Sequence, residues 1–191
     1  MSTGSIPHAP IVMTGPLTRG DFLMQIYWFA DLVAVPEVRG ITGLSRLTRL
    51  ALILGEESGV SRQMEPYFTF HRTPSGGIAS QDVWSGLAAL RGYQVLTPLR
   101  SDEAMPAEEI EERRFLLEHV IPAAERREYS MPAYYERDVL TNKGTFFAAK
   151  REDQTTQRRV EILKQAAALN ELPLVELTAR ALRLLREVGV R

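Results

Sequence analysis

Two arginines offer the clearest chemistry in this sequence, because they lie at helical spacing in an otherwise apolar stretch. Arg46 and Arg49 are three residues apart within residues 42–54, which are rich in Leu. Residues three apart share one face of a helix, and a guanidinium group binds phosphate or carboxylate through parallel hydrogen bonds. The pair predicts a contact with nucleic-acid phosphates or with an acidic partner. The alternative is a salt bridge to a neighbouring helix or exposure to solvent.

Catalytic groups are sparse in the chain. The three histidines, His8, His71 and His119, are far apart, and none has a second metal ligand three or four residues away. There is no cysteine, and no phosphate-loop, dinucleotide-binding or nucleophile-elbow pattern occurs. We therefore predict a protein that is not an enzyme and that holds no cofactor and no metal. The alternative within the enzymes is a small one that acts through carboxylates.

Two further patterns could imitate a ligand site. One is a run of acidic residues in a predicted helix, Glu108, Glu109, Glu111 and Glu112, which is followed directly by Arg113 and Arg114. Because this spacing spreads the carboxylates over more than one face, we interpret the run as a solvated face with intrahelical ion pairs. The other is Ser75-Gly76-Gly77, which lacks the lysine of a phosphate loop and predicts a hairpin or wing turn.

The composition is that of an ordinary globular protein. The chain has 191 residues, of which 45% are hydrophobic and 25% are charged, and its net charge is −1. Nucleic-acid-binding proteins commonly have a basic surplus, so any DNA contact would require a local basic patch. The absence of cysteine suits a reducing compartment, and no apolar run is long enough for a membrane-spanning helix. The sequence thus predicts a cytoplasmic protein without a membrane partner.

Apolar periodicity predicts a mostly helical chain with a few short strands. Helices are expected from Thr18 or Asp21 to before Pro36, with Thr42 as the N-cap of the next one, and then at residues 42–54, 79–91, 107–118, 155–169 and 174–188. Strands are expected at residues 67–71, 93–99 and 134–140. This set predicts an α+β fold. Residues 1–16 are expected to form a flexible N-terminal tail, and residues 17–191 a single domain with a C-terminal helical extension.

Three segments, in this order, resemble a known group of proteins. The first is the amphipathic helix at residues 42–54. The second runs from Phe68-Thr-Phe-His-Arg-Thr-Pro-Ser-Gly-Gly to Asp82-Val-Trp-Ser-Gly-Leu-Ala-Ala-Leu-Arg-Gly-Tyr-Gln-Val-Leu, and the third joins Val139-Leu-Thr-Asn-Lys-Gly to Leu169-Asn-Glu-Leu-Pro-Leu-Val-Glu-Leu. Over residues 42–188 the chain resembles the winged-helix proteins of the Panacea and YwgA-like group. The turn at residues 73–77 and the N-terminal helix with Tyr27 and Trp28 depart from the group's pattern.

The resemblance implies a winged-helix-like unit with short β-hairpins and added N- and C-terminal helices. Some proteins of the group resemble antitoxins or adaptors that act by protein–protein contact, and others are regarded as DNA-binding regulators. We therefore expect a non-enzymatic regulatory or adaptor protein with a protein partner. The alternative is a sequence-specific DNA-binding transcriptional regulator.

A DNA-binding winged helix would place residues 79–91 in the major groove as its recognition helix. Gln81 and Ser85 would then read base edges. This hypothesis also requires the basic residues nearby to share one face. Whether the partner is DNA or a protein, the contact residues expected from the sequence are Arg46, Arg49, Arg72, Gln81, Ser85 and Arg91.

The N-terminal helix suggests a second kind of contact. Its apolar residues from Phe22 to Val33 recur at helical spacing, and the C-terminal helix has a similar stripe. Together they offer more apolar surface than a small core needs. We therefore expect that the protein could form a homodimer.

Overall fold

Two buried helices form the centre of the fold. The computed structural model describes residues 16–32, 39–152 and 155–187, so the tail predicted at residues 1–16 lies almost wholly outside the described residues. Helix α1 spans Arg19–Asp31, and helix α2 spans Leu44–Glu57. Thr18 begins α1 with a capping box, in which its Oγ1 accepts the Asp21 N–H at 3.1 Å and its own N–H donates to Asp21 Oδ2 at 3.0 Å. Most side chains of both helices are buried.

A three-stranded antiparallel sheet covers one side of α1. Its strands are β1 (Ile41–Thr42), β5 (Glu136–Leu140) and β4 (Leu96–Arg100), in the order β1-β5-β4. The register pairs Ile41 and Pro98 with Asp138. Ile41 and Asp138 are buried, whereas Pro98 on the edge strand β4 is exposed. A separate hairpin joins β2 (His71–Arg72) to β3 (Ile78–Ala79).

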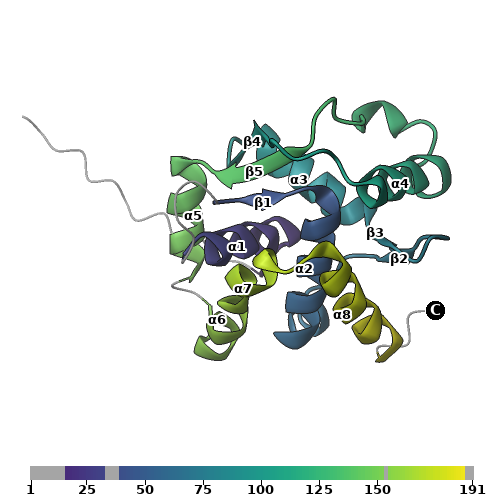
Figure 1. Ribbon diagram of the computed structural model, residues 1–191. Helices are drawn as coiled ribbons and strands as arrows, with labels where there is room; N and C mark the ends of the chain where they lie inside the picture. Colours follow the sequence, from purple (N-terminus) through teal and green to yellow (C-terminus); the bar gives the residue numbers. More distant parts are fainter. Residues whose placement is uncertain (1–15, 33–38, 153–154, 188–191) are drawn as a thin grey trace, which may run out of the picture.

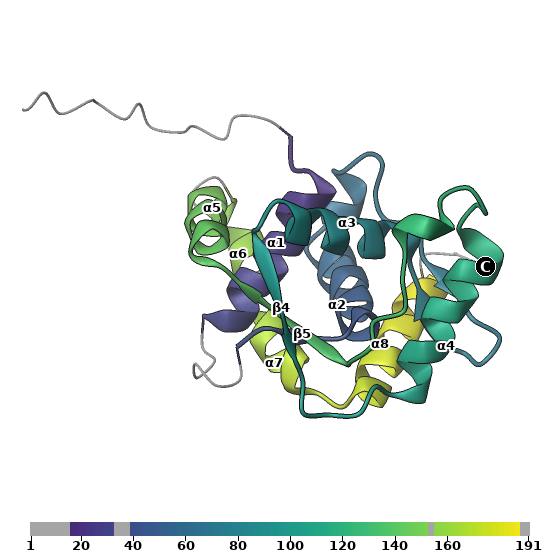
Figure 2. The same ribbon diagram turned by 90° about the horizontal axis from the view of Figure 1, so that it is seen from above.

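The remaining helices enclose the centre from several directions. Figure 1 shows the sheet above α1, with α6 (Gln157–Leu163), α7 (Gln165–Glu171) and α8 (Leu174–Glu187) below. Helices α5 (Asn142–Glu152) and α4 (Ala107–Phe115) lie at the two ends of the sheet. Figure 2 shows α3 (Gln81–Gly92) and α7 on opposite sides of β5. The described residues also form short 3-10 helices at η2 (Val60–Arg62) and η4 (Arg126–Glu128) and a short π-helix at η3 (Leu116–Val120).

The predicted α+β fold with mostly helical elements is confirmed, but several local predictions are corrected. Thr42 lies in β1, and Gly43 is the N-cap of α2. Only His71 of the predicted strand at residues 67–71 belongs to a strand. Before it, the Thr69 N–H donates to the Asp82 carboxylate at 2.7 Å and not to a neighbouring strand. The helix predicted at residues 155–169 is divided at Lys164 into α6 and α7.

The apolar side chains of α1 pack against other elements of the same chain. Phe22, Ile26 and Phe29 are each at most 1% exposed, because α2, α3, α5 and α7 pack around the helix. Val33, the last residue of the predicted apolar run, lies outside the described residues. The expectation that α1 has a spare face for a homodimer is therefore wrong for the part that the structure describes.

Candidate functional site

Arg49 lies inside the protein and not on a contact surface. Its side chain is 0% exposed, and it donates to two carboxylates of α4, with Nη1 2.7 Å from Glu112 Oε2 and Nη2 2.5 Å from Glu108 Oε1. Burial lowers the pKa of the guanidinium, but Glu112, Glu108 and Glu109 together raise it more, so the pKa of Arg49 lies above its ordinary value. We call Arg49, Glu108 and Glu112 the Arg49 cluster. The contact with a phosphate or partner that the sequence suggested does not apply to Arg49, because the cluster joins α2 to α4.

Glu109 of α4 caps the N-terminus of α2 from a distant part of the chain. Its carboxylate accepts the backbone N–H groups of Leu44 at 2.9 Å and Ser45 at 2.7 Å, and it also accepts Arg113 Nε at 2.7 Å. The N-cap residue itself, Gly43, has no side chain that could do this. Glu109 is 0% and Glu112 3% exposed. The interpretation of the acidic run as a solvated face is therefore wrong for these two residues.

Arg91 at the end of α3 is bound to β5. Its Nε lies 2.6 Å from Asp138 Oδ1 and its Nη2 2.8 Å from Asp138 Oδ2, and Glu136 Oε2 is also 2.8 Å from Nη2. Burial lowers the pKa of Arg91, but these carboxylates raise it more, so the net pKa is above its ordinary value. The positive charge that the DNA hypothesis assigned to Arg91 is thus neutralised within the fold.

The polar residues expected to read bases are partly covered. Ser85 Oγ and the Tyr129 hydroxyl are 2.6 Å apart, and Gln81 Nε2 lies 3.5 Å from the same hydroxyl. The segment around η4 therefore lies over the first turns of α3. Arg72 is exposed on β2. The expected contact residues are consequently not brought together on one face with unpaired positive charge.

Arg46 is the expected contact residue that borders a cavity. It is half-buried, and its Nη1 donates to the carbonyl oxygens of Asn170 at 2.6 Å and Leu172 at 2.8 Å, where α7 ends. Burial lowers the pKa of the Arg46 guanidinium. The cavity has a volume of about 300 Å³, and we call it the Arg46 cavity; its other polar lining residues are Thr42, Glu103, Tyr135, Arg137, Asn170 and Glu171.

Tyr135 closes one side of the Arg46 cavity over the start of α2. Its hydroxyl donates to the Thr42 carbonyl at 3.3 Å, and burial raises its pKa. A Cβ atom on Gly43 would lie 2.5 Å from the Tyr135 hydroxyl oxygen, and Gly43 also has a φ of +84°. Because side chains rarely adopt that backbone conformation, this close approach requires a glycine.

Two connecting segments between β4 and β5 carry exposed apolar side chains. Residues 101–106 lead into α4 and residues 129–135 lead into β5, and the Ser101 N–H donates to the Tyr135 carbonyl at 2.9 Å where they meet. Met131 is 40% and Tyr134 53% exposed. The Arg100 guanidinium lies 4.3 Å from the centre of the Tyr134 ring. We call these two segments the connector surface.

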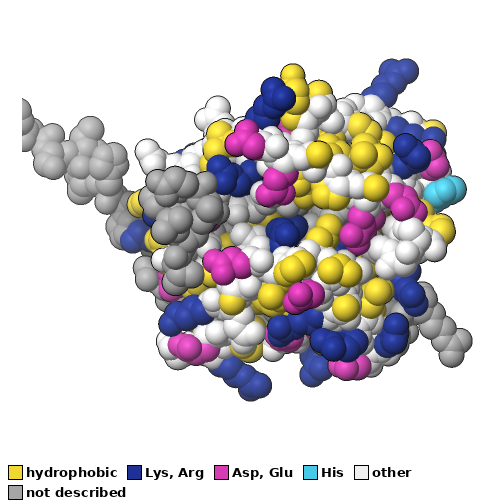
Figure 3. Space-filling view, in the orientation of Figure 1, with side chains coloured by type: hydrophobic (Ala, Val, Ile, Leu, Met, Phe, Trp, Pro, Cys, Tyr) yellow, Lys and Arg dark blue, Asp and Glu magenta, His cyan; other side chains and the backbone are white. Residues whose placement is uncertain are grey.

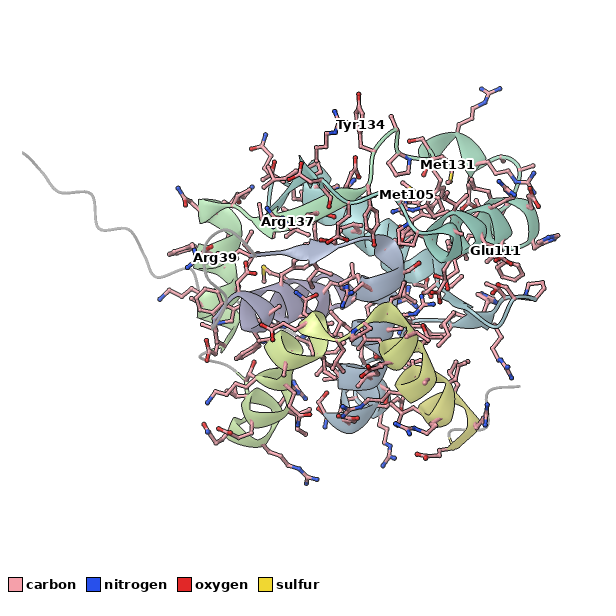
Figure 4. The ribbon with its side chains drawn as sticks, viewed as in Figure 1. Arg39, Met105, Glu111, Met131, Tyr134 and Arg137 are labelled. Carbon is pink, nitrogen blue, oxygen red and sulfur yellow. The ribbon has the colours of Figure 1, made fainter. Side chains whose placement is uncertain are left out.

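The connector surface and the Arg46 cavity adjoin each other. Glu103 and Tyr135 line the Arg46 cavity and also a second cavity of about 590 Å³ beneath the connector surface. Figure 3 shows hydrophobic side chains gathered over the connectors on this face. Figure 4 shows Met105, Met131 and Tyr134 on the same upper part of the molecule, with Arg137 beside them toward α5.

Several classes of site are not found in the described part of the chain. Within residues 16–32, 39–152 and 155–187, no group of three or more acidic or histidine side chains could hold a metal ion. No described helix has both the length and the apolar character to cross a membrane.

No family model, curated protein or solved structure matches the chain.

Sequence reasoning missed most of the residues that build these two sites. Glu103, Tyr135 and Asn170 come from three separate segments, so no local spacing relates them. A usable signal existed for Met131 and Tyr134, because these large apolar side chains lie close to Pro132 in a segment that connects two predicted elements. Apolar residues in a surface loop often mark a contact.

Proposed function

We propose that this protein is a non-enzymatic regulatory or adaptor protein that acts through protein–protein contact at the connector surface. The observation that carries the proposal is the exposure of Met131 and Tyr134 on a connection whose base is fixed by the backbone bond between Ser101 and Tyr135. Methionine and tyrosine are enriched at protein interfaces. The Tyr134 side chain has few rotatable bonds, so it loses little conformational freedom on binding.

We further propose that the scaffold is a winged helix with long insertions, similar to the Panacea and YwgA-like group. The order of elements supports this: α1, β1, α2, α3, β4 and β5 follow one another, and the sheet order is β1-β5-β4. On this proposal, β4 and β5 are the wing strands, and α3 occupies the position of the recognition helix. The hairpin β2–β3 is inserted between α2 and α3, and α4 is inserted between the wing strands.

A DNA-binding regulator remains the second proposal, because on the winged-helix proposal α3 would serve as the recognition helix. The pairing of positive charge within the fold argues against DNA binding. Arg91 is paired with Asp138 and Glu136, and the first turns of α3 contact Tyr129. Phosphate contacts supply most of the affinity of non-specific DNA binding, so a paired arginine contributes little.

Two measurements separate the proposals. The first is fluorescence anisotropy with a generic duplex DNA at low and moderate salt, for which we expect no binding. Binding that weakens steeply with salt would favour the DNA-binding regulator.

The second measurement compares proteins captured from a cytoplasmic extract by the wild type, by Tyr134→Ala and by Tyr93→Ala. Tyr93 is the matched control, because it is 71% exposed and lies outside the connector surface. We expect the wild type and Tyr93→Ala to capture the same partner, and Tyr134→Ala to lose it. Equal capture by all three proteins would remove the connector surface as the interface.

A further inference from the structure

We propose that the Arg46 cavity binds a small zwitterion that carries both a carboxylate and an amine, as an amino acid does. This goes beyond the contact proposed for the connector surface, because the ligand would lie in a separate cavity. The cavity lies between the start of α2, the end of α7 and the edge of the sheet. Its lining includes two arginines and two glutamates, Arg46, Arg137, Glu103 and Glu171.

Arg46 is arranged to receive a carboxylate. Its Nη1 is occupied by the carbonyls of Asn170 and Leu172, which fix the plane of the guanidinium. Among the residues that the structure describes, its Nε and Nη2 have no hydrogen-bond partner, and no carboxylate lies within ion-pair distance. A fixed guanidinium with two donors free matches the fork of a carboxylate. Its partial burial strengthens that attraction relative to an arginine in open water.

The other side of the cavity is suited to an amine. Glu103 and Glu171 are exposed at its rim and form no ion pair within the described part of the chain. Asn170 also lines the cavity, and its buried Oδ1 accepts no hydrogen bond in the described structure. The two exposed carboxylates supply the acceptors for an ammonium group, directly or through one water. A ligand with negative charge alone, such as phosphate, would meet both glutamates unfavourably.

The size of the cavity also limits the ligand. A volume of about 300 Å³ is at the lower end of small-molecule sites. Its apolar lining consists of the small residues Ala30 and Ala167. This arrangement fits a compact polar molecule.

The test is a thermal-shift measurement on the full chain with each common L-amino acid in turn. A ligand at about ten times its dissociation constant should raise Tm by about 3–5 °C. For the amino acid that gives the shift, the matching amine without the carboxylate and the matching acid without the amine should each give none. Acetate and inorganic phosphate serve as anion probes and should also give none. No shift with any amino acid, or an equal shift with acetate or phosphate, would overturn the proposal.

Variants of the cavity residues test where the ligand binds. Arg46→Gln should abolish the shift, and Arg183→Gln, which changes an exposed arginine of α8, should retain it. Glu103→Gln replaces an exposed residue, so it should fold normally and weaken binding at least about tenfold through loss of the amine contact. Retention of the full shift by Arg46→Gln, or of full affinity by Glu103→Gln, would show that the ligand binds elsewhere or without the proposed contacts.

Discussion

Arg46 and Arg49 lie one turn apart on α2, yet their surroundings differ completely. Helix α4 covers Arg49 and surrounds its guanidinium with Glu108 and Glu112, so the side chain is 0% exposed. Among the described residues, the hydrogen bonds of the Arg46 side chain go to two backbone carbonyls at the end of α7, which bind one of its terminal nitrogens. Arg49 is therefore a buried structural residue whose charge is paired, whereas Arg46 keeps hydrogen-bond donors that a ligand could use. The segment that packs over each arginine determines its role, and in both cases that segment is distant in the sequence.

Because Arg49 is buried, we expect its substitution to lower the free energy of unfolding strongly. Moving a charge out of water costs several kcal/mol, and a partner charge offsets this only where the hydrogen bonds are complete. The Arg49 cluster meets that condition, because Glu112 also accepts the Ser45 hydroxyl at 2.5 Å and the Ile78 N–H at 2.9 Å. At Arg46, water and the cavity still reach the guanidinium. The two positions should therefore respond very differently to the same substitution.

The largest effect is expected for Arg49→Met. This change leaves Glu112 buried without its cation, and we expect a loss of about 3–5 kcal/mol in the free energy of unfolding. Urea-induced unfolding followed by circular dichroism measures it. Glu111→Ala is the control, because Glu111 is exposed on the same helix (Figure 4) and should change stability by less than about 0.5 kcal/mol. A loss below about 1 kcal/mol for Arg49→Met would show that the cluster is not a closed structural unit.

A smaller loss is expected for Arg91→Met. The change removes both hydrogen bonds to the buried Asp138, but Arg91 is 27% exposed, so water can partly replace them. We expect a loss of about 2–3 kcal/mol in the same urea experiment. Arg72→Met, on the exposed strand β2, should be nearly neutral. If Arg91→Met were also neutral, Arg91 would be free for an external phosphate, and the DNA-binding proposal would gain support.

The difference between the two arginines marks the limit of what the sequence could predict. Leu47, Ala51 and Leu54 recur at helical spacing, and this periodicity correctly predicted a helix with an apolar face. The identity of the segment above each arginine depends on tertiary packing. Glu109 lies 65 residues after Leu44, to whose N–H it binds. Local patterns contain no information on such a pairing.

The same reasoning applies to the two candidate sites. Arg46 could be selected from the sequence, because an arginine on an apolar helix is unusual. Glu103 and Asn170 could not be selected, because an isolated polar residue in a connecting segment resembles any other surface residue. Of the four glutamates before Arg113, Glu109 and Glu112 were misjudged, since helical spacing alone does not show that another helix N-terminus lies against Glu109.

Glu109→Gln tests the cap that α4 supplies to α2. Glutamine keeps one acceptor oxygen but loses the charge that favours a helix N-terminus and the ion pair with Arg113. We expect a loss of about 1–2 kcal/mol in the free energy of unfolding. Glu111→Gln serves as the control on the exposed face of α4. An unchanged stability would mean that water caps α2 equally well.

The smallest effect on stability is expected for Arg46→Met, the counterpart of Arg49→Met. The substitution removes two hydrogen bonds to carbonyls at the end of α7, and it leaves no buried carboxylate without a partner. Because water can reach the half-buried site and hydrate the released carbonyls, we expect a loss of about 1 kcal/mol or less. The measurement is urea-induced unfolding of both arginine variants under identical conditions.

The ratio of the two losses is more informative than either value, since both variants remove the same group from the same helix. A loss at Arg46 near that at Arg49 would mean that the carbonyl bonds hold α7 against α2, so that Arg46 is a structural residue like its neighbour. The Arg46 cavity would then be a packing gap beside a structural arginine. A loss several-fold smaller leaves Arg46 with donors that the fold itself does not need, which is the condition for a ligand to use them.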